Sequence, residues 1–404
     1  MRIVFVNLHV DASMVKTASK YIFKQSVATK HRYLLDYLIN NTNLEVCSYI
    51  NHNGTSIASK LPSFLMKILT ACRFMESRWV LKKNGLEGKI TILKKVSDIK
   101  HDDIIIVHQL FAKKSPELGD INSFKAMSLL HFLGLKSNSD AIKTCKPQFL
   151  FCESDLKHQC KIFQENYSWW DKDIYVHPFV PEARFKSIKP FEERKNLVFS
   201  TGTITYIKHP DFISVYGNPC YQPLRKYILD HQEELKGKID CYNSNYSENA
   251  NKKMQAKPNE FKIFRLIKSG YSKLFASQQK SYYSFNMVEK FNEYKMCFIG
   301  EEVFNVPGIG FTEGMACGCA YIGQRGLYED YGMKDGVHYI GYDGTIKNLM
   351  EVINYYMQPE NQDKLKEIAE NGHHYVTENF KGEIVAKKLI DKLIEEQQRF
   401  LQGQ

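Results

Sequence analysis

One carboxylate stands among small residues in the segment "VPGIGFTEGMACGCAYIG", which spans residues 306–323. Gly308 and Gly310 precede Thr312 and Glu313, and small side chains follow. A glycine-rich loop that leads into a helix presents backbone N–H groups and the positive end of the helix dipole, which favour a phosphate. We expect Thr312 to cap this helix and Glu313 to lie at its start, where a carboxylate could accept hydrogen bonds from sugar hydroxyls. The alternative is a tightly packed helix whose dipole Glu313 stabilises; it explains the carboxylate but not the glycines.

Three further side chains could move a proton or attack a substrate. His108 and Glu153 each end an apolar run, "DIIIVH" and "PQFLFCE", where a side chain would project from the edge of a sheet. Asp230 lies in the predicted helix "RKYILDHQ". Glu153 is the first choice as general base or acid, and Asp230 is a candidate nucleophile. A packed histidine and a solvated surface carboxylate are the ordinary alternatives for His108 and Asp230.

Cationic and hydroxyl side chains gather where the second half of the chain begins. The segment "STGTITYIKHPDF" contains Ser200, Thr201, Lys208 and His209, and Arg225 follows in the next predicted helix. A lysine and a histidine can neutralise a phosphate leaving group, and the proline after them makes the backbone rigid. We therefore assign all five residues to a predicted site for a phosphate-bearing ligand. An exposed Arg225 and a chance Lys-His-Pro run are equally good alternatives.

The composition indicates a globular protein with reduced thiols. The chain has 404 residues, of which 43% are hydrophobic and 25% are charged, as in soluble proteins of two or three domains. Its ten cysteines form no Cys-x-x-Cys pair, which predicts buried thiols and no zinc site. The formal net charge of +10 favours anionic partners. Neither a signal peptide nor a membrane-spanning stretch is visible, so we expect a cytoplasmic protein.

Apolar, β-branched runs alternate with helical patterns along the chain. Such runs without strict alternation are typical of parallel strands covered on both faces, so the sequence predicts two successive α/β domains. The predicted domains are residues 1–178, residues 179–382 with a basic insertion at 244–285, and a C-terminal helix at 383–404 that packs back on the first domain. The amphipathic part of the insertion is either an ordinary surface helix or a contact with an anionic membrane.

The segment around Glu313 resembles the "EAMACG-P-VI" segment of the GT-B glycosyltransferases, above all of retaining family 4 and its spore-coat-type relatives. "HPFVPEARF" resembles the linker into their nucleotide-binding domain, and "FLFCESD" resembles the last strand of their first domain. The resemblance implies two Rossmann-like domains that face a cleft, with an acceptor at the first and a nucleotide-sugar donor in the second. It also implies that Glu313 binds the ribose of the donor, that His108 contacts the donor sugar, and that no metal or other cofactor takes part.

The sequence departs from family 4 just upstream of Glu313. That family has a second glutamate eight positions earlier, in contact with the donor sugar, and this chain has Asn305 there. A carboxylate pair stands a few residues before it, and we assign its second member, Glu302, to the donor site together with Asn305. The run Lys208-His209 resembles an element of bacterial sialyltransferases and related enzymes that use CMP-activated acidic sugars. These features leave the donor open between a hexose and an acidic sugar.

The predicted function is the transfer of a sugar from a nucleotide-activated donor to a glycan or lipid-linked glycan of a bacterial surface polysaccharide or glycolipid. The specific expectation is a CMP-Kdo-dependent Kdo transferase, and a UDP- or GDP-hexose transferase of the same fold is the alternative. A non-catalytic GT-B-like protein and a nucleic-acid-binding protein are two further hypotheses. The basic residues are dispersed, so no nucleic-acid partner is expected. The inner face of the cytoplasmic membrane is a candidate peripheral location.

Overall fold

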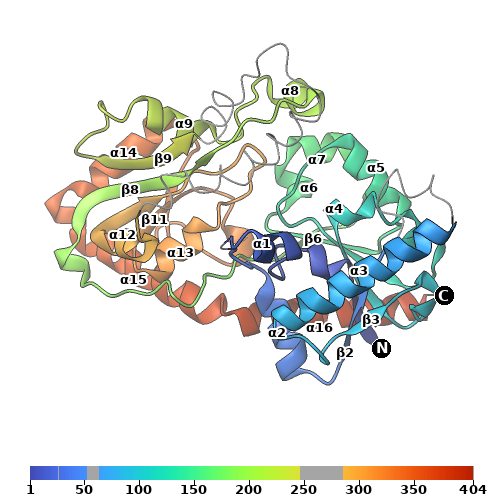
Figure 1. The fold of residues 1–404 in the computed structure, drawn as a ribbon. Helices are drawn as coiled ribbons and strands as arrows, with labels where there is room; N and C mark the ends of the chain where they lie inside the picture. The colour runs from blue at the N-terminus through green and yellow to red at the C-terminus, as the bar shows by residue number, and fades with distance from the viewer. Residues whose placement is uncertain (26, 52–62, 246–284, 404) are drawn as a thin grey trace, which may run out of the picture. The chain divides into compact units, whose positions relative to one another are not determined.

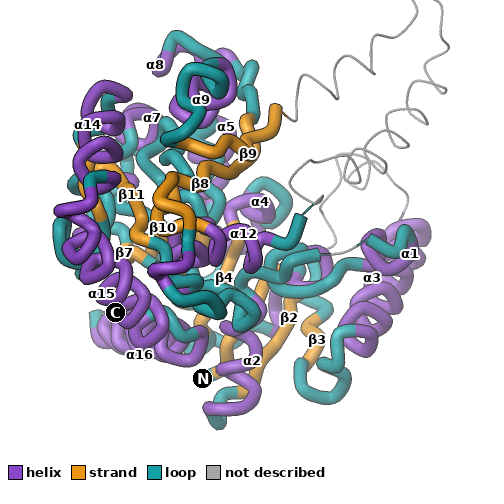
Figure 2. The backbone as a smooth tube through the Cα atoms, turned by 90° about the vertical axis from the view of Figure 1, so that its left-hand side faces the viewer, coloured by secondary structure: helices purple, strands orange, loops and turns teal. Residues whose placement is uncertain are grey.

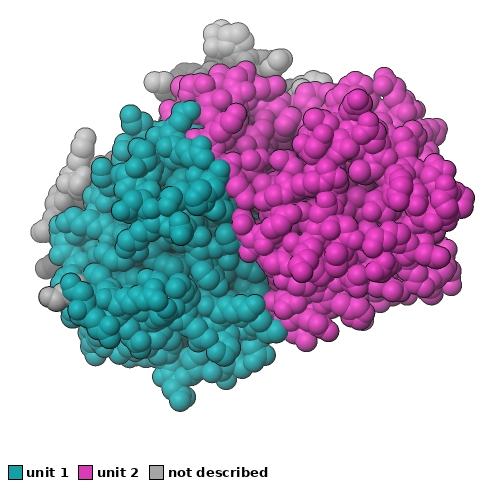
Figure 3. Space-filling model, turned by 180° about the vertical axis from the view of Figure 1, so that it is seen from behind, with its two compact units in different colours: residues 1–158, 162–180, 382–404 teal, residues 159–161, 181–381 magenta. Residues whose placement is uncertain are grey.

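The computed structural model describes residues 1–25, 27–51, 63–245 and 285–403, which fold into two compact units (Figure 1, Figure 3). Unit 1 comprises residues 1–158, 162–180 and 382–404, and unit 2 comprises residues 159–161 and 181–381. These limits lie within two residues of the predicted boundaries at 178 and 382. Most of the basic insertion lies outside the described residues, and with it the predicted amphipathic segment and its membrane contact.

Unit 1 is built on a parallel sheet of seven strands in the order β3-β2-β1-β4-β5-β6-β7. The strand order reverses between β1 and β4, as in a doubly wound Rossmann-like sheet. The strands are β1 Arg2–Val6, β2 Glu45–Tyr49, β3 Thr91–Leu93, β4 Ile104–His108, β5 Phe124–Ser128, β6 Phe149–Cys152 and β7 Tyr175–Val176. The helices that accompany them are α1 Ala18–Ile22, α2 Arg32–Asn41, α3 Ser63–Lys83, α4 Gln109–Ala112, α5 Lys136–Thr144, α6 Leu156–Gln159 and α7 Lys161–Asn166.

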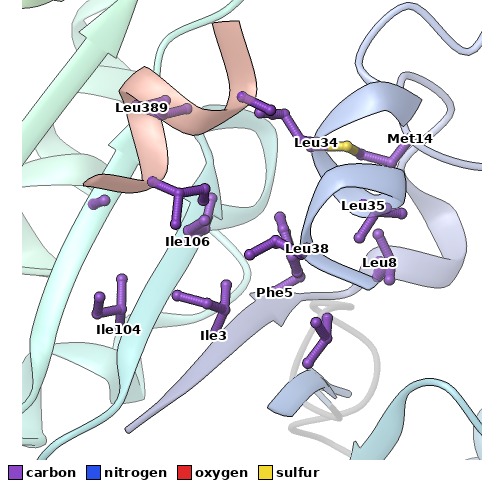
Figure 4. Close-up of a cluster of buried hydrophobic side chains, with 14 of the residues drawn as sticks. Ile3, Phe5, Leu8, Met14, Leu34, Leu35, Leu38, Ile104, Ile106 and Leu389 are labelled. Carbon is purple, nitrogen blue, oxygen red and sulfur yellow. The ribbon is translucent and has the colours of Figure 1, made fainter. Parts of the chain in front are cut away.

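The core of unit 1 forms because its central strands are apolar throughout. Every residue of β1 is buried, as are the four isoleucine and valine residues of β4. The final helix, α16 (Gly382–Gln402), packs against α2, β4 and β5. In Figure 4, Leu389 of α16 lies beside Ile106 of β4, and both belong to one buried cluster with Leu38 of α2. The predicted return of the C-terminal helix to the first domain is confirmed.

Unit 2 is built on a parallel sheet of five strands in the order β12-β11-β10-β8-β9. The order reverses between β8 and β10, so this sheet is also doubly wound. The strands are β8 Lys195–Ile204, β9 Ile239–Asn245, β10 Tyr294–Phe298, β11 Ala320–Gln324 and β12 Ile340–Tyr342. The helices are α8 Pro210–Tyr216, α9 Pro223–Asp230, α12 Met287–Glu293, α13 Gly310–Ala316, α14 Ile346–Met357 and α15 Gln362–Asn379.

Strands and helices alternate through both units, as Figure 2 shows for the described residues, so the predicted α/β class is confirmed. Helix α15 packs against α13, α14 and β11 and closes one side of the unit 2 core. The two short strands β3 and β7, at the edges of the unit 1 sheet, were not predicted, because three and two residues carry no readable pattern. Within the described ranges, no helix combines the length and the apolar character that a membrane crossing requires.

Candidate functional site

Arg225 bridges the point where the strand order of unit 2 reverses. From the first turn of α9, its Nε donates to the carbonyl oxygens of Ile299 (2.5 Å) and Gly300 (3.1 Å), which follow β10. Its Nη1 donates to the carbonyl oxygen of Thr203 on β8 at 3.1 Å, and its Nη2 donates to that of Gly300 at 2.9 Å. Doubly wound sheets bind their ligands at such a reversal, on the carboxyl side of the strands.

The guanidinium of Arg225 is a buried cation. The side chain is 6% exposed, and burial lowers its pKa from the usual value, an effect that the field of Glu302 opposes. No carboxylate in the described part of the chain forms an ion pair with Arg225. A buried charge that has no direct ion-pair partner is costly, so this position can accommodate an anionic ligand.

Three glycines make room for this guanidinium. A Cβ on Gly308 would lie 2.7 Å from Nη2 of Arg225, and one on Gly202 would lie 2.9 Å from its Cδ. Gly300 approaches the same side chain, with a Cβ distance of 3.2 Å and a φ of +64°. Gly310 packs on an isoleucine side chain instead. The glycines predicted to approach a phosphate therefore have a second role, because they also clear the space that the guanidinium fills.

Helix α13 is buried over its whole length and begins three residues earlier than the sequence predicts. Its N-cap is Ile309, whose side chain makes no capping bond. Thr312 is the third helical residue, and its hydroxyl donates to the carbonyl oxygen of Ile309 at 2.9 Å. The predicted capping role of Thr312 is therefore wrong. Glu313, 5% exposed, lies in the first turn, where the helix dipole stabilises a carboxylate; its role toward a ribose stays a prediction.

The first carboxylate of the pair after β10, Glu301, joins the ends of three strands. Its Oε1 accepts hydrogen bonds from the backbone N–H of Gln324 (2.8 Å) and the hydroxyl of Tyr328 (2.8 Å), and its Oε2 accepts one from Tyr342 (2.7 Å). Burial, followed by the field of Glu301, raises the pKa of both phenols well above the usual value. Glu301 thus has a structural role, because it accepts hydrogen bonds that hold the strand ends together. The sequence did not reveal this role.

The second member of the pair and the asparagine after it keep more accessible positions. Glu302 is partly exposed, and its Oε1 accepts a hydrogen bond from Nε2 of Gln222 at 3.4 Å. Asn305 has a left-handed φ of +57°, and its Nδ2 donates to the carbonyl oxygen of Gln159 at 2.7 Å. Non-glycine residues hold this conformation where surrounding bonds impose it. Both residues lie in the loop that also supplies Gly308.

The other predicted ligand residues lie on β8 and in the loop after it. Ser200 and Thr201 are buried; Oγ of Ser200 accepts a hydrogen bond from Asn243 at 3.1 Å, and Oγ1 of Thr201 has no partner within the described ranges. Lys208 is exposed. His209 caps α8, because its Nδ1 accepts a backbone N–H two residues later at 3.3 Å. A proline at the first helical position is favoured, so the Lys-His-Pro run has a local reason in helix initiation.

Asp230, the candidate nucleophile, ends α9 at the protein surface. Its Oδ2 lies 2.5 Å from Nζ of Lys226, one helical turn earlier, and both side chains are well exposed. Arg225 lies five residues earlier on the same helix, which is about 7.5 Å along its axis. The carboxylate of Asp230 is thus engaged in an ordinary surface ion pair.

In unit 1, Glu153 follows β6 and is buried beside His131. Its two carboxylate oxygens accept the backbone N–H of His131 at 3.0 and 3.1 Å, and its Oε1 lies 3.7 Å from the imidazole Nδ1. The side chain of Glu153 is 1% exposed and that of His131 is 45% exposed. The accessible member of this pair is therefore the imidazole, which the sequence patterns did not single out.

His108 ends β4 and caps α4. Its Nδ1 accepts the backbone N–H of Leu110 at 3.3 Å, and burial lowers its pKa below the usual value. The imidazole lines a small hollow together with Asp11, Ser13 and Ser128. The predicted contact of His108 with a donor sugar stays a prediction.

Three more buried histidines lie close to this edge of the unit 1 sheet. His9 follows β1, His177 follows β7, and His31 immediately precedes α2. Burial lowers the pKa of His9 to about 4 and that of His177 to about 3, and it holds the pKa of His31 well below the usual value. Nε2 of His177 shares a 2.6 Å hydrogen bond with the hydroxyl of Tyr33, and the ring of His31 lies 5.5 Å from that of His131. The edge thus holds several imidazoles of lowered pKa, and those of His31 and His131 lie beside the carboxylate of Glu153.

A sequence signal existed for some of these histidines. His9, His131 and His177 each follow a short apolar run, as His108 does, and the carboxyl ends of parallel strands meet at one edge of a sheet. His31 has no such signal, because it precedes a helix. The structure brings Glu153 together with His131 and His31, and Arg225 together with Gly308.

Solved structures of glycosyltransferases have a similar fold over nearly the whole chain. HepE of Anabaena in complex with UDP and glucose is similar at 10% identity, with 97% of this chain and 99% of that chain covered and a TM-score of 0.52. A trehalose-6-phosphate enzyme of E. coli, bound with UDP-2-fluoro glucose, is similar at 9% identity, with 98% and 99% covered and a TM-score of 0.50. The predicted GT-B fold is confirmed. No protein-family model and no curated protein sequence matches the chain.

Proposed function

We propose that this protein is a glycosyltransferase that binds a nucleotide-activated sugar through unit 2. The GT-B fold supports this proposal, since two of the structures to which the chain is similar were solved with bound donor groups: HepE with UDP and glucose, and the E. coli enzyme with UDP-2-fluoro glucose. A UDP-sugar is therefore the donor that we favour. A metal ion is not needed to stabilise the leaving group, because fixed cations and backbone dipoles can do so.

The observation that carries this proposal is the buried guanidinium of Arg225. It lies where the strand order of unit 2 reverses, next to Gly308, and it has no carboxylate counter-ion among the described residues. A diphosphate would supply the missing negative charge, and arginine binds phosphate oxygens through two parallel hydrogen bonds.

The other donor contacts are proposed around this cation. Glu313 binds the ribose hydroxyls, Glu302 and Asn305 lie near the sugar, and the exposed Lys208 reaches the phosphates. The remaining members of the proposed donor site are Ser200, Thr201, His209, Gly308, Gly310 and Thr312.

The acid–base chemistry is proposed for unit 1. Glu153 holds His131 by two hydrogen bonds to its backbone N–H, and the accessible imidazole passes a proton between the acceptor hydroxyl and the buried carboxylate. His108 contacts the transferred sugar. In a retaining reaction Asp230 would be the nucleophile, although its surface ion pair with Lys226 makes it the weaker choice.

The identities of the donor and of the acceptor are separate proposals. CMP-Kdo is the alternative donor, which the Lys208-His209 run suggests, and GDP-hexoses are a further one. We propose a glycan or lipid-linked glycan of a bacterial surface polysaccharide as acceptor. The enzyme would then work in the cytoplasm, at the inner face of the membrane.

A thermal-shift titration with UDP, GDP and CMP, without added metal, tests this proposal. Since a ligand that binds only the folded state stabilises it by about 2.7 kcal/mol at one hundred times its Kd, UDP is expected to raise the melting temperature most. Selective stabilisation by CMP would instead favour the Kdo donor. If no nucleotide shifts the melting temperature, the chain is a non-catalytic GT-B protein and the proposal fails.

A further inference from the structure

We propose that unit 1 binds one divalent transition-metal ion of the zinc type through His31, His131 and Glu153. Each of these side chains offers one ligand atom, and the three atoms lie within 4.8 Å of one another. Nδ1 of His131 and Oε1 of Glu153 are 3.7 Å apart. Two ligands of a tetrahedral zinc ion, at bond lengths of about 2.1 Å, are separated by about 3.4 Å, so this pair already has nearly the required spacing.

His31 supplies a second, independent observation. Its side chain is 2% exposed, and neither ring nitrogen has a hydrogen-bond partner within the described ranges. A buried polar group without a partner carries an energetic cost, and folded proteins satisfy nearly all such groups. The ring lies 5.5 Å from that of His131. A metal ion at the cluster would give His31 the partner that the described residues do not provide.

The other two ligands are held in place by the backbone. The backbone N–H of His131 donates to both carboxylate oxygens of Glu153, and the thiol of Cys152 donates to its Oε2 at 3.4 Å; these bonds fix the orientation of the carboxylate. His131 keeps a left-handed φ of +56°, an uncommon conformation for a residue other than glycine. Three separate segments thus converge: the start of α2, the loop after β5 and the loop after β6.

The donor set decides the class of ion. Two imidazoles and one carboxylate suit zinc and its neighbours in the transition series, whereas magnesium and calcium prefer oxygen ligands alone. The 45% exposure of His131 leaves a route for the ion and a position for a water or substrate oxygen. Because the ion engages the lone pairs of His131 and Glu153, its occupancy and proton transfer at these groups exclude each other. That consequence depends on the proposed function, but metal binding itself does not.

The test uses the full chain without a purification tag, stripped with a chelator and titrated with Co²⁺. We expect one Co²⁺ per chain, a visible absorption band from the bound ion, and loss of that band when Zn²⁺ but not Mg²⁺ is added. His131→Gln and Glu153→Gln should each weaken Co²⁺ binding by at least about tenfold, since even changes behind the ligands have effects of that size. His31→Gln should do the same; should that buried change unfold the protein, the substitution at the exposed His131 still decides.

His158→Gln is the matched control. Nδ1 of His158 lies 2.6 Å from Oδ2 of Asp155 on the surface, a histidine–carboxylate pair that belongs to no group of three ligands among the described residues. Its loss should leave Co²⁺ affinity unchanged. The proposal is overturned if no stoichiometric Co²⁺ binds, if His131→Gln binds Co²⁺ as tightly as the wild type, or if His158→Gln weakens binding equally. UDP stabilisation is measured separately, so a failure here leaves the proposed transferase function standing.

Discussion

The carboxyl edges of the two sheets carry different chemistry on the same topology. In unit 2, the guanidinium of Arg225 lies on three backbone carbonyls and is closed in by glycines. In unit 1, the carboxylate of Glu153 lies beside the imidazoles of His31 and His131, of which that of His131 is accessible. An arginine stays charged at any physiological pH, whereas burial lowers the pKa of the His131 imidazole to about 3, so that this ring is neutral at pH 7.

This difference indicates that one fold can place the binding of the donor and the proton transfer on different sheets. A permanent cation is suited to hold an anion throughout a reaction, and groups that gain and lose protons are suited to the reaction itself. The two side chains also differ in packing. Hydrogen bonds to backbone carbonyls fix Arg225, whereas the side chain of His131 is 45% exposed. Substitutions at the two edges should therefore affect different measurements.

The largest expected effect is on turnover, at the unit 1 edge. Glu153→Gln keeps an oxygen that can accept the His131 N–H but removes the base, so we expect the rate of sugar transfer to fall by about 10²- to 10⁴-fold. The affinity for UDP should stay near the wild-type value. Transfer assays and calorimetric titration on the same preparation check both halves, and a wild-type rate would remove Glu153 from the mechanism.

The converse pattern is expected for Arg225→Met at the unit 2 edge. Loss of the charged hydrogen bonds should weaken UDP binding by about 1.5–3 kcal/mol, which isothermal calorimetry can measure. Lys226→Met, at the exposed neighbouring position on α9, is the matched control and should bind as the wild type does. Arg225→Lys keeps a charge if the methionine variant proves unstable. Unchanged affinity in a folded Arg225→Met protein would contradict the proposed phosphate contact.

Glu301→Gln should lower stability rather than binding. The new amide turns an N–H₂ group toward a phenol or backbone N–H that needs an acceptor, so the free energy of unfolding should fall by about 1–3 kcal/mol. Urea unfolding measures this. Glu329→Gln is the control, because Glu329 is exposed and accepts from only one phenol, Tyr339, at 2.9 Å; its effect should be much smaller. Equal effects of the two substitutions would show that burial of Glu301 does not matter.

Glu313→Gln should weaken UDP binding by about 1–2 kcal/mol, because a neutral amide accepts weaker hydrogen bonds from ribose hydroxyls than a carboxylate does. A comparison of UDP with inorganic pyrophosphate localises the loss, since pyrophosphate has no ribose and should bind both proteins alike. Unchanged UDP affinity in a folded variant would end the ribose assignment.

The smallest effect is expected for Asp230→Asn. Its ion pair with Lys226 is exposed, and such pairs contribute about 0.2–1 kcal/mol. Stability should therefore change little in thermal melts, and transfer should continue. Loss of transfer in a stable Asp230→Asn protein would instead identify Asp230 as the nucleophile of a retaining reaction.

Local patterns were sufficient for the alternation of strands and helices, the domain boundaries and the glycine loop before Glu313, because each depends on residues close together in the chain. The sequence also pointed to His108 and Glu153, since a polar residue that ends an apolar run lies at the carboxyl edge of a parallel sheet. It misplaced the start of α13, because Thr312 resembles a cap although the helix begins at Gly310 with Ile309 as its N-cap.

Only the tertiary structure decided which of these side chains meet. Arg225 reaches carbonyls more than seventy residues later in the chain, and Glu301 gathers hydroxyls from the ends of two other strand segments. His31 joins His131 and Glu153 from a helix start, a position without any local signal. The amino-acid sequence determined the helices and strands through short-range patterns of apolar residues. The packing of distant elements determined which side chains form the sites, because contacts between residues far apart in the chain produce no periodic pattern in the sequence.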